Sequence, residues 1–216
     1  MLQVHTFTFN SFEENTYVVF DETGEAAIVD PGCSNRAEED ELKNFIQANK
    51  LRVVYLLNTH CHVDHVLGNV FVKDYFKVPL LMHRADEPTL RAVKIYAPMY
   101  GIGGYTEALP DQFLEEGDTV KIGHETLKVL FLPGHAPGHI GFYHAPSARL
   151  LAGDVLFHRS IGRTDLPGGN FDVLIQSIHQ KVFTLPDEVV VYPGHGPTTT
   201  VGEEKVENPF CALSLN

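Results

Sequence analysis

The sequence lacks the features that mark disulfide-bonded, membrane-spanning or polyanion-binding proteins. Its 216 residues include three cysteines, an odd and widely spaced set that argues against a disulfide framework and favours a reducing compartment. Lys and Arg number 16 against 28 Asp and Glu, and this net charge of −12 disfavours contacts with nucleic-acid phosphates. The longest apolar runs are far too short to span a membrane, and the N-terminus shows no signal-peptide pattern. We therefore expect a cytoplasmic protein without nucleic-acid or membrane partners.

Tryptophan is absent, whereas histidine occurs 12 times. Hydrophobic residues make up 44% of the chain and charged residues 20%, which is enough apolar material for a folded core. The length suits one domain or a tightly fused pair of half-domains. The positions of the histidines are consequently the main guide to function.

Hydrophobic patterns predict strands and helices in two similar runs. The expected strands are 2–9, 15–20, 26–29, 51–57, 78–82, 119–122, 126–132, 140–144, 150–152 and 188–192. The expected helices are 36–49, 66–76, 171–183 and 201–206, together with a helix and loop within 86–114. Two packed sheets with helices outside would bury the apolar faces economically. We expect one α/β domain over 1–216, with pseudo-symmetric halves at roughly 1–115 and 116–216.

One cluster of ligand-type side chains directly follows the expected strand 51–57. In extended backbone His60 and His62 point the same way, and a helix starting near Asp64 turns Asp64 and His65 towards the same space. Burying four such side chains without a bound cation is costly. Imidazole and carboxylate are ligands for zinc and similar ions, so the cluster predicts a metal site.

Three more ligand-type residues, His135, Asp154 and His195, each follow an expected strand. A glycine precedes each of them and allows the tight turn that presents a side chain into a cleft. A lone histidine at a strand end is more often structural, and a lone Gly-Asp is usually a turn. The occurrence of all four pieces at four strand ends favours a shared metal centre.

The order and spacing of these seven residues resemble the metal motifs of the metallo-β-lactamase superfamily of metallohydrolases. The seven are His60, His62, Asp64, His65, His135, Asp154 and His195. Segments 160–165 and 207–210 make the chain most similar to a short, single-domain branch of glyoxalase II-like hydrolases. The resemblance implies a four-layer αββα sandwich that binds two divalent metal ions, with zinc expected and iron or manganese left open.

Transferred residue by residue, the resemblance implies two ligand sets. The first is His60, His62 and His135, and the second is Asp64, His65 and His195. Asp154 would bridge both ions, and Asp64 and Asp154 would be the catalytic residues around a metal-bridging hydroxide. This implies hydrolysis of a small thioester such as a hydroxyacylglutathione, because a thiol of pKa about 8.5 leaves readily as thiolate.

The sequence departs from the family pattern in the part that would contact glutathione. Longer glyoxalase II enzymes contact glutathione through a C-terminal helical domain, whereas this sequence ends soon after the last ligand. Glutathione contacts would have to come from segment 86–114 or from Arg163. An ion pair between Arg163 and Asp165 is the slightly favoured interpretation of that arginine. The tyrosines of segment 86–114 are expected mainly to pack the loop, with a place at the cleft mouth as the alternative.

Three residues near the motifs are expected not to bind metal. His139 and Asp30 would support the ligands through hydrogen bonds. Cys61 lies between two predicted ligands, but strand alternation points it away from them.

Other functions share this ligand pattern. A persulfide dioxygenase-like oxidoreductase would hold one iron through His60, His135 and Asp154, although the Pro-Gly-His195-Gly loop favours a second metal. The negative charge disfavours a nuclease of the tRNase Z type, and the absent export signal disfavours a true β-lactamase. The complete ligand set argues against a non-catalytic module. The sequence leaves open the native metal, the acyl and thiol groups, the pathway, and whether the protein is a monomer or a small homo-oligomer.

Overall fold

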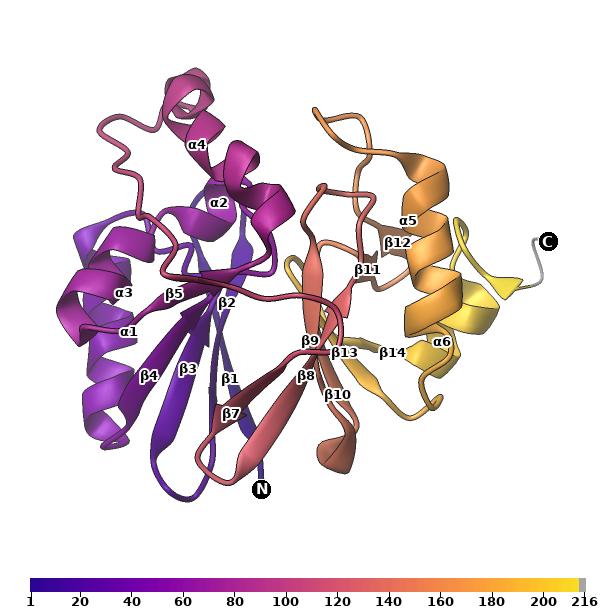
Figure 1. The fold of residues 1–216 in the computed structure, drawn as a ribbon, viewed down its shortest axis with the longest axis horizontal. Coiled ribbons are helices and arrows are strands. Elements are labelled where there is room, and N and C mark those ends of the chain that lie inside the picture. The colour runs from indigo at the N-terminus through magenta and orange to yellow at the C-terminus, as the bar shows by residue number, and fades with distance from the viewer. Residues whose placement is uncertain (214–216) are drawn as a thin grey trace.

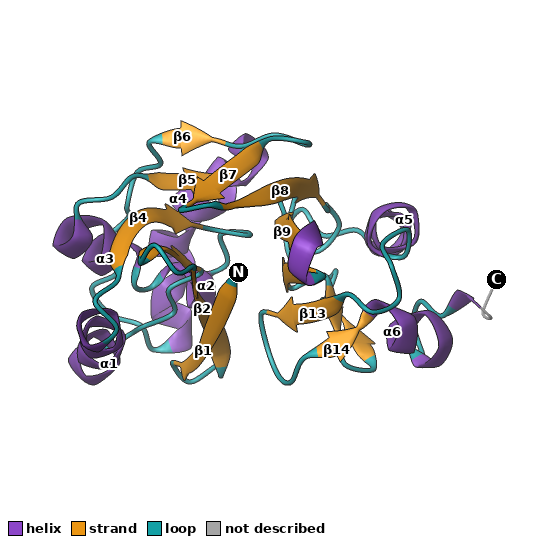
Figure 2. Ribbon diagram, turned by 90° about the horizontal axis from the view of Figure 1, so that it is seen from below, coloured by secondary structure: helices purple, strands orange, loops and turns teal. Residues whose placement is uncertain are grey.

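The structure, a computed structural model, describes residues 1–213 and consists of two six-stranded sheets with helices outside them (Figure 1). The first sheet has the strand order β1-β2-β3-β4-β5-β6, and the second has the order β14-β13-β10-β9-β8-β7. Strands β11 and β12 form a separate ribbon. Figure 2 shows α1 and α3 on one outer side and α5 and α6 on the other. The predicted α/β fold with helices outside two packed sheets is confirmed.

The strands of the first sheet are β1 (Gln3–Phe9), β2 (Glu14–Phe20), β3 (Glu25–Val29), β4 (Arg52–Leu57), β5 (Leu80–Met82) and β6 (Gln112–Phe113). Those of the second are β7 (Thr119–Ile122), β8 (Glu125–Phe131), β9 (Ile140–His144), β10 (Arg149–Gly153), β13 (Val190–Pro193) and β14 (Thr199–Thr200). The ribbon is β11 (Leu156–Phe157) and β12 (Ser160–Ile161). The α-helices are α1 (Arg36–Ala48), α2 (Val63–Val66), α3 (Asn69–Phe76), α4 (Glu87–Tyr96), α5 (Phe171–Ser177) and α6 (Val201–Glu207).

Parallel strand pairs bring the predicted ligand loops to one edge of the molecule. In the first sheet β3, β4 and β5 run parallel, so the loops after β3 and β4 leave at the same end. In the second sheet β10 and β13 run parallel with Gly153 opposite Pro193. Parallel strands must be joined by crossover connections, so sequence-distant loops meet at their carboxyl ends. Asp154 and His195 therefore lie side by side.

Three layers of apolar side chains hold the sheets and helices together. Tyr17, Leu57 and Phe142 belong to the cluster between the two sheets. A second cluster packs α1 and α3 against the first sheet, and a third packs α5 against the second sheet. Fully burying a side chain such as Phe142 contributes about 1.5–3 kcal/mol to stability. The resulting frame positions the ligand loops on well-packed strands.

Two predicted helices differ from the structure. The expected helix 66–76 is two helices, because the chain turns at Gly68, whose N–H donates to the Pro31 carbonyl at 2.7 Å. A side chain at this position would lie 2.3 Å from the Cys33 sulfur, so glycine permits the close approach. The expected helix 171–183 ends as an α-helix at Ser177 and continues as a π-helix, Ile178–Val182.

The strands missed by sequence patterns, β6, β11, β12 and β14, have two residues each, which is too short for a recognisable alternation. Within residues 1–213 no helix is both long and apolar enough to cross a membrane. The single domain over 1–216 with halves divided near residue 115 stays a prediction, and its residues 214–216 lie outside the described range.

Candidate metal centre

The first ligand loop follows β4 and runs into α2, so His60 and His62 precede the helix and Asp64 and His65 lie in it. Asp30, just after β3, holds this loop in place through hydrogen bonds. Its carboxylate accepts the Thr59 N–H at 2.7 Å and the Thr59 hydroxyl, and it lies 3.2 Å from His65 Nδ1. Asp30 adopts φ 48°, a left-handed conformation that aspartate tolerates better than most residues. It supports the ligands, as the sequence predicts.

The other ligands come from three loops of the second sheet. His135 follows β8, and its Nδ1 lies 2.7 Å from the Arg163 carbonyl. His195 follows β13, and its Nδ1 lies 3.0 Å from the Phe12 carbonyl. A carbonyl can only accept, so Nδ1 of each ring carries a proton, and Nε2 is the ring atom that faces the cluster. Backbone carbonyls thus orient both histidines for metal binding.

The first predicted ligand set is a compact group of buried histidines. The ligand atoms of His60, His62 and His135 all lie within 4.8 Å of one another. His62 Nδ1 is 2.8 Å from His135 Nε2, which in turn is 3.2 Å from His60 Nε2. Burial and the charge of neighbouring histidines lower the pKa of His60 far below its usual range and that of His62 to about 3. Both rings are therefore neutral, which is the metal-binding form.

The second predicted set combines a carboxylate with two histidines. The ligand atoms of Asp64, His65 and His195 also lie within 4.8 Å of one another. Asp64 Oδ2 is 3.1 Å from His195 Nε2 and 3.6 Å from His65 Nε2. Burial alone would raise the pKa of Asp64, but the adjacent His65 and His195 outweigh it and lower that pKa. The set therefore contains an ionised carboxylate.

Asp154 contacts both sets. Its Oδ1 lies 3.5 Å from His65 Nε2, and its Oδ2 lies 3.5 Å from His135 Nε2 and 3.6 Å from His195 Nε2. Burial opposes ionisation of Asp154, but His65, His135 and other histidines around it outweigh burial and lower its pKa strongly. Oδ1 thus faces the second set, whereas Oδ2 lies between a histidine of the first set and one of the second, so this carboxylate is placed to be shared by both sets.

The unpaired atoms of the cluster fit bound cations. Within residues 1–213, buried His65 Nε2 and Asp154 Oδ1 have no hydrogen-bond partner. A buried polar atom without a partner costs about 1–3 kcal/mol, and a cation between these atoms would remove that cost. Nitrogen and carboxylate donors of this kind suit zinc, iron and manganese. The structure therefore contains a candidate binuclear metal site, and the assignment of each ligand stays a prediction.

Two predicted non-ligands lie where the sequence places them. Cys61 is fully buried among Val63, Val66 and other apolar residues, with its sulfur 3.7 Å from that of Met82. It therefore points away from the metal cluster. His139 Nε2 accepts the Asp154 N–H at 3.0 Å, which steadies the predicted bridging residue without joining the cluster.

Asp86, which the sequence does not mark as part of the site, is a buried residue that joins the loop after β4 to the loop carrying His135. One carboxylate oxygen accepts the Cys61 N–H at 2.5 Å, and the other accepts the Gly138 N–H at 3.1 Å. The Thr89 hydroxyl donates to the second oxygen at 3.1 Å. Asp86 lies in the irregular segment 86–114 with no motif around it, so only the folded contacts reveal this role.

A cleft of about 960 Å³ opens above the metal cluster. Its walls come from α4, from the 3₁₀ turn Ala97–Tyr100 that follows α4, and from segment 157–167; α4 and segment 157–167 both rise along the upper edge of Figure 1. Tyr96 and Tyr100 line the cleft, whereas Tyr105 does not. The sequence predicts that most of the three tyrosines pack the loop, and this is wrong, because Tyr96 and Tyr100 line the cleft. Arg163 and Asp165 form the expected ion pair at 2.7 Å.

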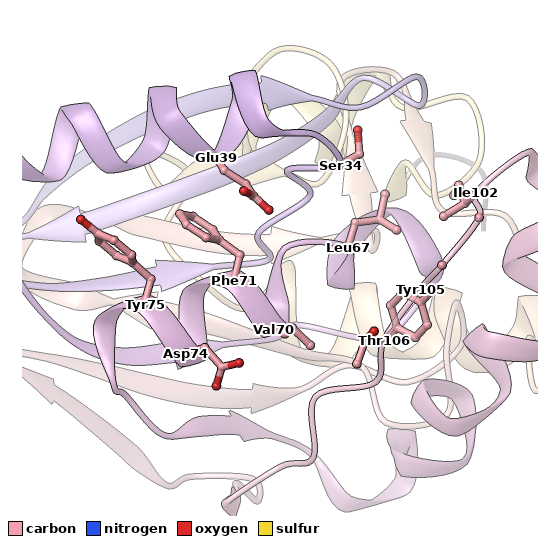
Figure 3. Close-up of a pocket in the computed structure, with 12 residues that line it drawn as sticks. Ser34, Glu39, Leu67, Val70, Phe71, Asp74, Tyr75, Ile102, Tyr105 and Thr106 are labelled. Carbon is pink, nitrogen blue, oxygen red and sulfur yellow. The ribbon is translucent and has the colours of Figure 1, made fainter.

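A second hollow, of about 520 Å³, lies on the outer side of the first sheet (Figure 3). Glu39 of α1 and Phe71 and Tyr75 of α3 line it, together with segment 102–106. None of the seven predicted ligands lines this hollow. The cleft above the metal cluster is therefore the candidate substrate site.

Comparison with known proteins agrees with this geometry. The family model described as the metallo-beta-lactamase superfamily matches residues 11–195. The chain is 36% identical to hydroxyacylglutathione hydrolase GloC of Haemophilus influenzae, over 97% of this chain and 98% of the relative. It is 36% identical to the crystallised BLEG-1 B3 metallo-beta-lactamase, with a TM-score of 0.88 over 98% of this chain and 99% of that one. The structure of TTHA1623 in a di-iron-bound form gives 36% identity and a TM-score of 0.86, over 96% of this chain and 100% of that one.

Proposed function

The chain belongs to the metallo-beta-lactamase superfamily as a metal-dependent hydrolase, and from this premise we propose that it hydrolyses small thioesters. The observation that carries the proposal is the contact of Asp154 with both ligand sets at the floor of a cleft. A hydroxyacylglutathione, the type of substrate for which the similar GloC protein is named, is the first thioester to test.

The chain would hold two divalent ions through the two ligand sets, with Asp154 shared between them. When bound, such ions lower the pKa of water to about 7 and polarise a carbonyl oxygen. Asp64 and Asp154 supply negative charge that offsets part of the charge of the ions. Asp30 and the backbone carbonyls of Arg163 and Phe12 keep the histidine rings oriented. Catalysis then needs no serine or cysteine nucleophile. This agrees with the side chain of Cys61, which is buried and points away from the metal cluster.

The groups around the cleft favour a thiol as leaving group. In the overall reaction the oxygen of water bonds to the acyl carbon, the carbon–sulfur bond breaks, and a carboxylic acid and a thiol are released. Asp64 and Asp154 are ionised, and burial raises the pKa of Tyr96, so none of the three is a ready proton donor. A thiolate leaves without a proton, whereas an amide nitrogen needs one. Thioester hydrolysis is therefore the reaction these residues support best.

The main alternative, a one-iron dioxygenase, does not use the second ligand set. Here Asp64, His65 and His195 come together as closely as the first set does, and a structure similar to this chain is described as di-iron-bound. Both observations support two ions and hydrolysis. The identity of the metal is left to measurement.

The proposal is tested with purified protein reconstituted with zinc, iron or manganese. We expect two ions per chain by mass spectrometry, and release of thiol from S-lactoylglutathione or another small thioester that chelators stop and added metal restores. Inactivity of every metal form towards a thioester panel would contradict the proposal. One iron per chain with oxygen uptake on glutathione persulfide would instead identify a dioxygenase.

A further inference from the structure

Outside the metal cluster, the walls of the cleft are mostly apolar. Phe12, Ala92, Met99, Ile161 and Leu166 line it, and prolines and aromatic rings form most of the remaining wall. Apolar walls bind a ligand by removing its apolar surface from water, at about 25 cal/mol for each Å². They also impose a cost on any charged group that enters without a partner. The wall composition therefore carries information about the substrate.

Arg163 is the Lys or Arg residue whose side chain lines the cleft. Of the Lys and Arg residues in the described chain, no other lines the cleft. Its Nε and Nη2 donate to the two carboxylate oxygens of Asp165, each at 2.7 Å, in a bidentate pair. Both side chains are exposed, at 60% and 67%. The charge of Arg163 is thus already paired within the protein, in a solvent-exposed ion pair that a substrate carboxylate would have to displace.

The other polar groups of the walls are also largely committed. The Thr89 hydroxyl donates to Asp86, and the Arg163 carbonyl lies against the ring of His135. The hydroxyl groups of Tyr96 and Tyr100 are the remaining polar groups of the walls outside the metal cluster and Arg163. Two phenols can donate to an amide or ester oxygen but do not balance a carboxylate and an ammonium group.

We propose that the cleft selects thioesters with an apolar acyl group and an uncharged thiol part, and that it disfavours glutathione thioesters. Glutathione carries two carboxylates and one ammonium group, and among residues 1–213 no side chain that lines the cleft outside the metal cluster offers them an unpaired charge. The net charge of −12 adds a general repulsion of anionic substrates. This inference rests on the proposed thioester hydrolysis and concerns only which thioesters are preferred.

A panel of four thioesters separates the acyl part from the thiol part. S-hexanoyl and S-lactoyl groups are each joined to N-acetylcysteamine, an uncharged thiol, and to glutathione, and kcat/KM is measured with the metal-loaded protein. We expect hexanoyl-N-acetylcysteamine to be the best substrate and lactoylglutathione the poorest. A butanoyl thioester of N-acetylcysteamine is measured beside the panel. Extending its acyl chain to hexanoyl should raise kcat/KM by about three- to fourfold per methylene.

A substitution outside the walls tests the role of the ion pair. Asp165→Asn should release the Arg163 charge and raise kcat/KM for the glutathione thioesters about two- to fivefold relative to the N-acetylcysteamine thioesters. Asp187→Asn is the matched control, since Asp187 pairs with Lys205 at 2.6 Å and precedes β13 at the end opposite His195. The control should keep the original ratio, and circular dichroism should show both variants folded.

The outcomes distinguish this inference from the proposed function. Failure to hydrolyse any of the four thioesters would contradict the proposed function. Hydrolysis of all four with a preference for the glutathione member of each pair would leave thioester hydrolysis standing and overturn the inference. An unchanged ratio in Asp165→Asn would overturn the claim that Asp165 neutralises Arg163.

Discussion

The two ligand sets of the candidate centre share one loop but differ in composition and enclosure. The first set consists of three histidines that are each at most 8% exposed. The second set includes the carboxylate of Asp64, and its His195 side chain is 27% exposed at the cleft. Each set takes its remaining histidine from a different loop of the second sheet. The comparison shows one enclosed, nitrogen-rich site and one mixed site that opens towards the substrate.

This difference leads us to expect unequal binding of the two ions. An enclosed set of neutral imidazoles exchanges slowly with solvent, because its ligands have little freedom to move apart. The open set depends on His195, which is anchored by one carbonyl contact of its ring and by backbone contacts of its loop. The following substitutions test this inequality in order of expected effect.

Asp154→Ala should have the largest effect, because it removes the side chain in contact with both sets. We expect metal content to fall from two ions to less than one, and kcat/KM to fall by about a thousandfold or more. Mass spectrometry of the purified variant and thioester kinetics give the two numbers. Retention of both ions with little loss of activity would show that the two sets do not depend on a shared carboxylate.

His195→Ala should affect the open set alone. One ion should be lost and the other retained, with a decrease in kcat/KM of about a hundredfold. His135→Ala is the matched variant in the enclosed set, and it should release the other ion. The comparison fails if either single substitution removes both ions.

Asp86→Asn should weaken the enclosed set more than the open one. Asp86 ties the backbone next to His60 and His62 to that of the loop carrying His135, and within residues 1–213 its side chain forms no hydrogen bond with the His195 loop. We expect affinity for the first ion to fall about tenfold and unfolding free energy to fall by about 1–3 kcal/mol. Competition with a chromophoric chelator measures the first quantity, and denaturant titration measures the second. Equal weakening of both ions would contradict the specific link to the first set.

Cys61→Ser should have the smallest effect on catalysis, although Cys61 lies between two predicted ligands in the sequence. Its side chain packs against Met82 and other apolar residues. We expect activity within about twofold of the original and a loss of about 1–2 kcal/mol in stability, because a hydroxyl replaces a weakly polar thiol in an apolar site. A loss of activity as large as that of Asp154→Ala would mean that the two roles are wrongly assigned.

The sequence predicts the convergence of the seven side chains because each follows a strand, and strand ends are signalled by apolar runs that stop at glycine or polar residues. His60 and His62 also follow directly from alternation in extended backbone. Asp86 carries no comparable signal. Its role depends on contacts with the backbone of Cys61 and Gly138, which are far from it in sequence.

The same distinction holds for the fold. Long strands such as β1, β4 and β8 have enough residues for a pattern, whereas two-residue strands such as β14 are set by their neighbours. The break at Gly68 is another example, since it reflects the approach of Cys33 and Pro31 from another part of the chain. Patterns within one segment thus predict elements and ligand-type side chains at strand ends, but they do not predict contacts such as those of Asp86 and Gly68 with distant parts of the chain.

The pairing of β13 with β10 has a consequence for how the protein acquires its metal during synthesis. His60, His62, Asp64 and His65 leave the ribosome early, while His135, Asp154 and His195 belong to the second sheet and emerge later. His195 reaches the centre only after β13 has joined the sheet. A nascent chain that has not yet exposed His195 lacks one member of the second set, so assembly of both sets requires synthesis and folding through β13 and the loop that follows it.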